Sequence, residues 1–429
     1  MKIEIEKLIY GGAGIGHADG KAVFVKKSVP SDTLEVNIAK DKKNFAEGII
    51  EKVIKPSFDR IEPKCLHFQN CGGCDYQNIS LTNQLKFKQE IFVETLKRQG
   101  IETKILPIIA TGDFNYRNVM RFYLIENCNK LSLAMHDINN SLIPISRCYL
   151  ISEQANEIIQ KFLIVINNSI EKDIYRQIRI RQSHTFDKIM IELITEQPIA
   201  IKDSLVALAK QEGIASLYNS IGENDRELDR RLLFGSPIIF DKIGKYKFQI
   251  SPESFFQTNT FGAEILYDQI KEIAGTKMGD RVLDLFCGTG SIGIYLSTIA
   301  KSVFGIEINQ NAVNDAKANA RINKIPNIKF ICADLSAPQQ WNNEAIEQSN
   351  LIILDPPRSG LSPALIETLS SLLVPRSSSL VYVSCDPATF ARDIKEFAKY
   401  NFVLKKVQPV ELFPQTFHIE CVGLISRNE

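Results

Sequence analysis

The carboxy-terminal part of the sequence alternates short apolar segments with amphipathic ones, and this alternation restricts the fold more than any other feature. We expect strands at 281–286, 302–308, 328–332, 351–354 and 379–384, with helices at 291–298, 311–323, 362–373 and 387–400. Two more strands are expected at about 402–409 and 418–425. Alternating strands and helices form a parallel sheet that is covered by helices on both faces. The pattern therefore predicts a doubly wound, Rossmann-like α/β domain over 253–429.

The residues before this domain follow other patterns. Short alternating segments separated by tight turns predict an OB-like β-barrel over 1–58. Residues 59–252 mix short strands with helices at about 82–98 and 153–162, and we expect a central α+β domain there. A chain of 429 residues is long enough for these three domains.

Composition and charge exclude several classes of protein. With 44% hydrophobic and 24% charged residues, the chain is ordinarily globular, and no apolar run reaches the length of a membrane span. The segment after Met1 alternates polar and apolar residues and lacks the apolar core of a signal peptide, so we expect a cytoplasmic protein. A net charge of +1 gives no overall attraction to nucleic acid, so RNA affinity must come from local patches. We expect a monomer without an obligate protein partner.

A glycine-rich turn follows the first predicted strand of the last domain. Gly288, Gly290 and Gly293 match G-x-G-x-x-G, which dinucleotide enzymes share because backbone must approach a ligand closely there. Asp284, just before the turn, suits a ligand with a cationic amino-acid end and would repel a pyrophosphate. Glu307 ends the next strand, where a carboxylate can bind both hydroxyls of a ribose. These features favour S-adenosylmethionine over a dinucleotide.

Asp355-Pro356-Pro357-Arg358 follows the fourth predicted strand, and dinucleotide folds do not require such a motif. It resembles the Asn/Asp-Pro-Pro-aromatic motif of exocyclic-amine methyltransferases, in which the aromatic ring stacks on the base. Arg358 stands in the place of that ring. Methylation of an exocyclic amine is therefore the second candidate activity.

Cys385 is expected at the carboxyl end of a strand, where ligands bind in this architecture. The N-terminus of the helix that begins at Pro387 would favour its thiolate. Carbon C5 of uracil becomes nucleophilic only after a thiolate adds to C6, and a base must then remove the C5 proton before the thiol can leave. Glu420 is the candidate base.

Both residues also have a simpler interpretation. A cysteine on an apolar strand usually serves as a small buried apolar residue, as we expect for Cys287, Cys332 and Cys421. A single glutamate on a strand is usually solvated. The strand and turn patterns alone leave these alternatives open.

A second group of cysteines lies near the start of the central domain. Cys65, Cys71 and Cys74 have C-x5-C-x2-C spacing, in a chain with nine cysteines and no export signal. Disulfides are therefore not expected, and a metal role is favoured. Cys148 can complete a tetrad, and Cys128 is an equal candidate for the fourth position. Four thiolates suit either zinc or an iron–sulfur cluster.

Residues 175–181 are expected to form a strand that carries Arg179 and Arg181 on one face. Such a pair can contact a phosphate backbone, or it can lie on a solvated face. The sequence does not decide between these two interpretations.

The whole chain resembles the bacterial 23S ribosomal RNA 5-methyluridine methyltransferases that carry an N-terminal TRAM domain. The resemblance covers nearly the full length and rests on motifs in the same order. These motifs lie at 65–74, 116–118, 251–259, 284–290, 355–358, 384–387 and 413–420.

The resemblance implies methylation of uridine C5 in RNA, with 23S rRNA as the first candidate substrate and tRNA as the second. It implies that Cys385 forms a covalent adduct with C6 and that Glu420 removes the proton. The implied S-adenosylmethionine contacts are Gln257, Phe286, Ser291, Glu307, Asp334 and Asp355. The implied ligands of a [4Fe–4S] cluster are Cys65, Cys71, Cys74 and Cys148. The barrel would bind RNA, and the target uridine would be flipped into the pocket.

The residue after the proposed nucleophile departs from the family pattern. The family usually has Asn there, whereas this chain has Asp386. Asn both donates and accepts hydrogen bonds, but an ionised Asp only accepts them. The change is harmless if the side chain caps the following helix. Otherwise it motivates a third candidate, an inactive RNA-binding or assembly factor.

Overall fold

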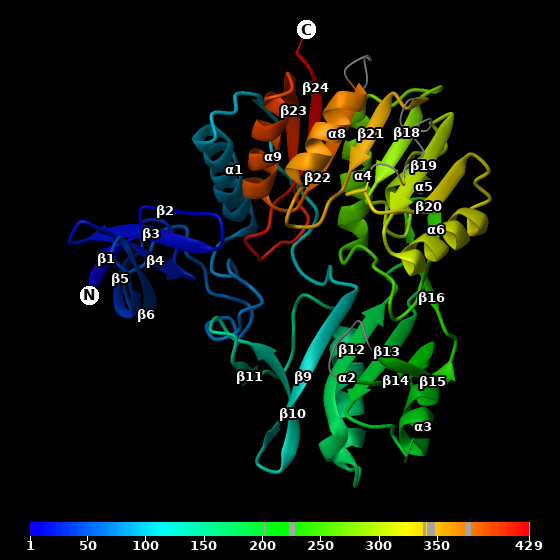
Figure 1. Cartoon of the computed structure of the whole chain (residues 1–429). Helices are drawn as coiled ribbons and strands as arrows, with labels where there is room; N and C mark the ends of the chain where they lie inside the picture. Colours follow the sequence, from blue (N-terminus) through cyan, green and yellow to red (C-terminus); the bar gives the residue numbers. More distant parts are fainter. Residues whose placement is uncertain (201, 223–227, 338–339, 341–347, 374–378, 429) are drawn as a thin grey trace.

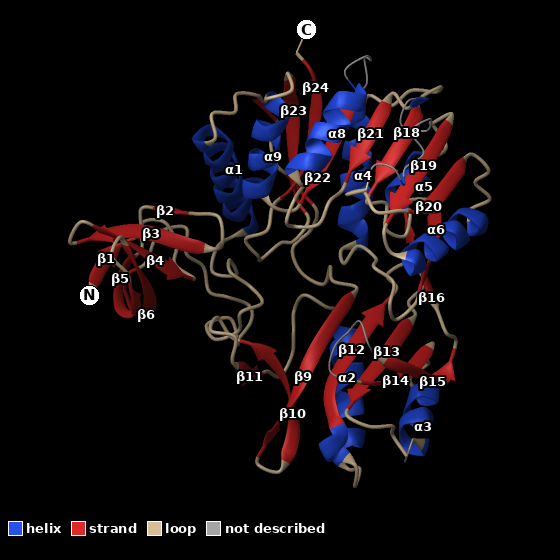
Figure 2. Ribbon diagram, in the orientation of Figure 1, coloured by secondary structure: helices blue, strands red, loops and turns tan. Residues whose placement is uncertain are grey.

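The chain folds around a small barrel sheet, a central sheet and a large carboxy-terminal sheet, which lie in separate regions of the molecule (Figure 1). The computed structural model describes residues 1–200, 202–222, 228–337, 340, 348–373 and 379–428. In Figure 2 the helices gather on the central and carboxy-terminal sheets, and the barrel consists of strands. This arrangement confirms the predicted fold class.

The barrel sheet has the strand order β1-β5-β6-β4-β3-β2. Its strands are β1 (Lys2–Glu4), β2 (Lys7–Leu8), β3 (Ala13–Ala18), β4 (Lys21–Lys26), β5 (Thr33–Asp41) and β6 (Phe45–Lys55). Alternate residues point inward, so Val23, Val25, Leu34 and Val36 form its core. The predicted OB-like barrel is confirmed.

The central sheet has the strand order β11-β10-β9-β12-β13-β14-β15. Its elements are β9 (Val119–Asn127), β10 (Lys130–His136), β11 (Leu142–Pro144), α2 (Glu153–Asn167), β12 (Tyr175–Gln182), β13 (Ile189–Thr195), α3 (Asp203–Gln211), β14 (Ser216–Ile221) and β15 (Asp229–Gly235), with a 3-10 turn at Lys172–Ile174. Helices α2 and α3 pack against this sheet through a shared apolar core that includes Ile159, Phe162 and Leu205. The central domain is therefore α+β, as predicted.

The carboxy-terminal sheet has the strand order β20-β19-β18-β21-β22-β24-β23-β7. Its parallel strands are β18 (Arg281–Leu285), β19 (Ser302–Glu307), β20 (Ile328–Cys332), β21 (Leu351–Leu354) and β22 (Ser379–Ser384). The strands β23 (Phe402–Glu411) and β24 (Glu420–Arg427) extend it in antiparallel fashion.

Helices cover both faces of this sheet. One apolar core joins it to α8 (Pro363–Leu373) and α9 (Pro387–Ala398), and another joins it to α4 (Thr260–Ala274), α5 (Ser291–Leu296) and α6 (Gln310–Ile322). The hairpin of β16 (Ile239–Ile243) and β17 (Tyr246–Ile250) packs in the second core. The doubly wound arrangement is thus confirmed.

One segment that the sequence assigned to the central domain packs on the carboxy-terminal sheet. Helix α1 (Leu81–Arg98) contacts α9, and β7 (Lys104–Ile105) and β8 (Ile109–Ala110) pair with β23 in parallel. Pairing between strands so distant in the chain leaves no local sequence pattern, so it could not be read from periodicity. The boundaries at 58/59 and 252/253 stay predictions.

No helix within the described part of the chain is both long enough and apolar enough to cross a membrane.

Candidate active site

The turn after β18 lets a ligand approach the backbone closely. Gly288 and Gly290 adopt left-handed conformations, with φ of 53° and 77°. A Cβ on Gly290 would lie 2.6 Å from the ring of Phe330, so a larger residue would force that ring, or β20 that carries it, to move. Phe286 also has positive φ, 63°, which is unfavourable for a bulky side chain and is characteristic of functional sites.

Asp284 lies inside the fold, directly beneath the glycine turn. Its side chain is fully buried, and Oδ2 accepts a hydrogen bond of 2.9 Å from the backbone N–H of Gly293. Burial, with a smaller contribution from the charge of Asp355, raises the pKa of Asp284 to about 8. The carboxyl group therefore braces the glycine turn through Oδ2, whereas Oδ1 is buried and has no hydrogen-bond partner among the described residues. Contact between Asp284 and the cationic end of a ligand stays a prediction.

The cofactor residues implied by the resemblance lie mostly at the ends of neighbouring parallel strands. Phe286 follows β18, Glu307 ends β19, Asp334 follows β20 and Asp355 follows β21. The ladder registers put these strand ends side by side. In an open α/β sheet, ligands bind at this edge.

Hydrogen bonds fix several of these side chains. Glu307 accepts the backbone N–H of Gly288 at 3.1 Å through Oε2 and that of Asn309 at 2.8 Å through Oε1. Asp334 accepts the N–H of Ser336 at 2.8 Å, which lowers the pKa of its carboxyl group. Burial raises the pKa of Asp355 to about 7.

Ser291 and Gln257, the two remaining predicted cofactor residues, both contact Tyr267, which no sequence pattern marked. The hydroxyl of Tyr267, on α4, lies 2.7 Å from Oγ of Ser291, the first residue of α5. It also has a hydrogen bond with the side chain of Gln257. Tyr267 therefore ties the loop before α4 to the glycine turn, and its spacing in the sequence gives no sign of this role.

Cys385 and Glu420 come from neighbouring antiparallel strands. The β22–β24 ladder pairs Ser384 with Cys421, and Cys385 and Glu420 are each the next residue along at the same end. Cys385 is half-buried, and burial followed by the charge of Glu420 raises its pKa to about 11. Burial also raises the pKa of Glu420 to about 8, with a further contribution from Asp355. Their surroundings therefore disfavour both the thiolate of Cys385 and the carboxylate of Glu420.

Glu420 is not the solvated side chain of the simpler interpretation, because only 7% of it is exposed. Among the cysteines that were expected to be buried, Cys287 and Cys421 are, but Cys332 is exposed. Cys332 is the last residue of β20, which is an edge strand among the described residues.

A cation faces the cysteine and the glutamate. The charge of Arg358 lowers the pKa values of both Cys385 and Glu420, in opposition to burial. Its guanidinium lies 3.2 Å from Nε2 of His418. Burial, and then the charge of Arg358, lower the pKa of that imidazole to about 4, so it is neutral and can accept the hydrogen bond.

Asp386 caps the helix that follows the cysteine. Its Oδ1 accepts the backbone N–H groups of Ala388 and Thr389, both at 2.9 Å, at the start of α9. Its Oδ2 accepts the hydroxyl of Tyr10, from the N-terminal barrel region, at 3.0 Å. Both Asp and Asn are strongly preferred caps, so the difference from the family pattern preserves this function.

A buried ion pair fastens the segment between β23 and β24, which precedes Glu420. Lys88 of α1 and Glu411 are both fully buried, with Nζ 2.7 Å from Oε1. Lys88 also donates to the carbonyl of His418 at 2.8 Å. Removing one partner of such a pair leaves a buried charge without compensation, so helix α1 is part of the support of the site.

The four implied cluster ligands gather around one small cavity. Its walls include Cys65, Cys71, Cys74 and Cys148, whereas Cys128 lies exposed in the turn between β9 and β10. The N–H of Gly73 and the amide of Gln77 donate to sulfur, at 3.4 Å to Cys71 and 3.3 Å to Cys74 respectively. Among the described residues, no three His, Cys, Asp or Glu side chains are arranged to hold a single metal ion.

The doubly wound sheet, the glycine turn and the carboxylates at the strand ends define a Rossmann-like fold of the S-adenosylmethionine-dependent methyltransferases. Comparisons with known proteins agree. Residues 80–428 match the family model described as tRNA (Uracil-5-)-methyltransferase, and residues 1–50 match the TRAM domain. The chain belongs to the tRNA (uracil-5-)-methyltransferase family, carries an N-terminal TRAM barrel, and is thereby an RNA uracil-5-methyltransferase.

Relatives of similar length support this assignment. An uncharacterised RNA methyltransferase of Caldanaerobacter subterraneus subsp. tengcongensis is 32% identical, over 100% of this chain and 99% of its own. An uncharacterised RNA methyltransferase of Fusobacterium nucleatum subsp. nucleatum is 34% identical, over 100% and 96%.

A solved structure shares the whole fold. The Pyrococcus abyssi tRNA (uracil-54, C5)-methyltransferase, in complex with S-adenosyl-L-homocysteine, has a TM-score of 0.78 and 24% identity, and the match covers 99% of this chain and 100% of that one.

Proposed function

We propose that this protein transfers a methyl group from S-adenosylmethionine to C5 of a uridine in RNA, through a covalent adduct between Cys385 and C6. The observation that carries the proposal is the pairing of Cys385 with Glu420 at one end of the β22–β24 ladder, beside Asp355. A nucleophile and a base at a common edge are what C5 methylation requires.

The residues of this chain divide the chemistry as follows. The Cys385 thiolate adds to C6, and the displaced electron pair moves through C5 to the O4 oxygen, where the cation of Arg358 stabilises negative charge. When bound, S-adenosylmethionine supplies an electrophilic methyl group, which C5 accepts. Glu420 then removes the C5 proton, the C5–C6 double bond re-forms, and Cys385 leaves as the thiolate.

Cofactor binding is assigned to Gln257, Phe286, Ser291, Glu307, Asp334 and Asp355. Glu307 suits the ribose hydroxyls, because it ends the strand next to the glycine turn and is oriented by two backbone N–H groups. The phenol of Tyr267 supports Ser291 and Gln257 from behind. The uridine would reach Cys385 by flipping out of the RNA.

The raised pKa values predict a reaction that accelerates with pH. Glu420, with a pKa of about 8, is mostly protonated at neutral pH, and the Cys385 thiol, with a pKa of about 11, is mostly protonated below that value. Both groups act in their deprotonated forms, so kcat/KM should rise steadily from pH 6 to pH 9. Initial rates of methyl incorporation across this range test the prediction. A rate that is constant between pH 6 and 8 would contradict the assigned base.

The RNA substrate is 23S rRNA or tRNA. The cysteine motif resembles that of the 23S rRNA enzymes, whereas the Pyrococcus abyssi relative acts on tRNA. Nucleoside mass spectrometry of both RNA fractions, from cells with and without this gene, tests the proposal. Loss of 5-methyluridine from one fraction identifies the substrate. If neither fraction loses it and the purified protein binds RNA without methylating it, the chain is the inactive factor instead.

We infer that the protein acts in the cytoplasm as a monomer.

Cys65, Cys71, Cys74 and Cys148 are proposed to hold a [4Fe–4S] cluster with a structural role. Every ligand of a zinc ion must lie within about 2.3 Å of one point, whereas each iron of a cluster takes its own thiolate. Thiols spread around a cavity, with N–H donors directed at sulfur, therefore suit a cluster better than a single ion.

Metal analysis tests this assignment. Protein purified without oxygen should contain about four iron and four sulfide ions per chain. The C148A variant should lose most of this iron, and the control variant C128A should keep it. Stoichiometric zinc with no iron would contradict the cluster.

A further inference from the structure

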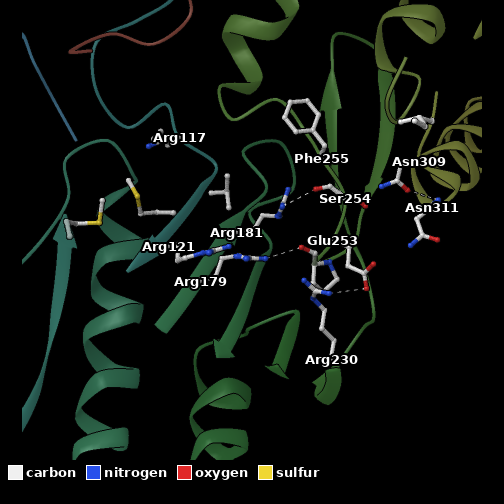
Figure 3. A pocket seen from close by; sticks show the side chains of 15 residues that line it. Arg117, Arg121, Arg179, Arg181, Arg230, Glu253, Ser254, Phe255, Asn309 and Asn311 are labelled. Atoms are coloured by element: carbon white, nitrogen blue, oxygen red, sulfur yellow. Dashed lines mark hydrogen bonds and ion pairs between the residues drawn. The ribbon is translucent and has the colours of Figure 1, made fainter. Parts of the chain in front are cut away.

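A cavity of about 940 Å³ lies between the central sheet and the cofactor end of the carboxy-terminal sheet. Arginines supply most of its charged wall (Figure 3). They come from β9 and the segment before it, from β12 and from β15, and are Arg117, Arg121, Arg179, Arg181 and Arg230. The opposite wall consists of 252–255 and of Ile308, Asn309 and Asn311, directly after Glu307.

Ion pairs hold two of these arginines in place. Glu192 pairs with Arg179 at 2.8 Å and with Arg230 at 3.0 Å, and Glu253 lies 3.3 Å from Arg230. Among the described residues that line the cavity there are five arginines and one carboxylate, so this wall carries an excess of positive charge. Arg179 and Arg181 are 9% and 7% exposed, so the interpretation of 175–181 as a solvated arginine face is wrong.

Arg181 is the residue that points to a ligand. Its Nη2 donates to the carbonyl of Ser254 at 3.2 Å, but within the described residues Nε and Nη1 are buried and have no hydrogen-bond partner. Burial, and then the charge of Arg179, lower the pKa of Arg181 to about 10. Buried donors without partners are costly, and an anion in the cavity would satisfy them.

The rim of the cavity indicates the kind of anion. Phe255 and Ile308 are each 65% exposed, although both are large and apolar. Aromatic rings beside arginines bind nucleotides, because bases stack on the rings while guanidinium groups bind phosphates. The cavity adjoins Glu307, but Cys385 and Glu420 are not in its wall.

We infer that this arginine cavity binds the phosphodiester backbone of the substrate RNA next to the flipped uridine. The inference rests on the proposed function and adds to it the place where the RNA strand is held. The central domain would thus provide the phosphate contacts that position the RNA, while the carboxy-terminal domain carries out the methyl transfer.

Binding of a fluorescein-labelled single-stranded oligouridylate to the full-length protein, with S-adenosyl-L-homocysteine present, tests the inference without turnover. R181Q and R121Q should each weaken binding roughly fivefold and reduce the salt slope by about 0.7, the value for one phosphate contact on a single strand. R176Q is the matched control, since Arg176 lies on the same strand but is exposed and paired with Glu196. It should match the wild type.

Calorimetric titration with S-adenosyl-L-homocysteine distinguishes a loss of RNA binding from a loss of cofactor binding. The affinity for S-adenosyl-L-homocysteine should be unchanged in R181Q and R121Q. If oligouridylate affinity and salt slope stay at the control value in both variants, or if cofactor affinity falls instead, the inference is overturned. Should R181Q fail to fold, R121Q decides, because Arg121 is only partly buried. If RNA binding depends on these arginines but no 5-methyluridine is formed, the proposed function is refuted and the assignment of the cavity still holds.

Discussion

Replacing Cys385 with alanine should lower the rate of 5-methyluridine formation by ~10⁴-fold or more, because loss of a nucleophile removes the whole covalent pathway. Without addition of sulfur to C6, carbon C5 is too weak a nucleophile to accept the methyl group. The fold should tolerate the change, since Cys385 is half-buried and lies just beyond the end of β22. Methyl incorporation into RNA and thermal unfolding, measured on the same preparation, check both expectations.

The matched control for this experiment is C128A. Cys128 lies exposed in the turn between β9 and β10 and is not in the wall of the cysteine cavity. C128A should keep wild-type activity. A C385A protein that forms 5-methyluridine at the normal rate would rule out the covalent mechanism.

Replacing Glu420 with glutamine should slow turnover by ~10²- to 10⁴-fold, the usual contribution of a general base. The adduct should still form, because sulfur adds to C6 before the C5 proton has to be removed. The methylated uridine would then stay bound to Cys385, since the C5 proton must leave before sulfur can. The variant should therefore accumulate a covalent protein–RNA complex.

A denaturing gel with labelled RNA detects that complex, and the double variant C385A/E420Q should not form it. E157Q serves as the control, since Glu157 is exposed on α2, away from the sheet edge that carries the site. If E420Q turns over normally, or is slow without any trapped complex, Glu420 is not the base that releases the adduct.

Much of the site was predictable because its residues follow local rules. The strands β19, β21 and β22 end at or just before a proposed site residue, so Glu307, Asp355 and Cys385 could be placed at one edge from the alternation alone. The glycine turn could also be predicted from the sequence, because only glycine avoids the contact that a Cβ on Gly290 would make.

Other features depend on residues that are far apart in the sequence. Tyr10 bonds to Asp386, and Lys88 pairs with Glu411, across separations of 376 and 323 residues. No periodicity or motif marks these contacts, because each depends on how domains pack. The hydrogen bond from Gly293 to Asp284 likewise depends on packing, because a carboxylate at a strand end can face a ligand, brace a turn or do both.

The arginine cavity shows the same limit. Period-two spacing correctly put Arg179 and Arg181 on one face of β12. The sequence could not show that Arg121 and Arg230 join them from β9 and β15, or that the loop at 252–255 closes over the group. Because Arg179 and Arg181 are buried by these elements, they belong to a candidate binding site and not to a solvated face.

Release of tritium from RNA labelled at C5 of uridine tests the central claim most directly. The substrate is RNA from cells that lack this gene, grown with [5-³H]uridine, and the reaction contains the purified protein and S-adenosylmethionine with a ¹⁴C-labelled methyl group. Methylation at C5 replaces the C5 hydrogen, so one tritium should enter water for each methyl group that enters RNA. Methyl incorporation without tritium release would put the methyl group on another atom and contradict the mechanism.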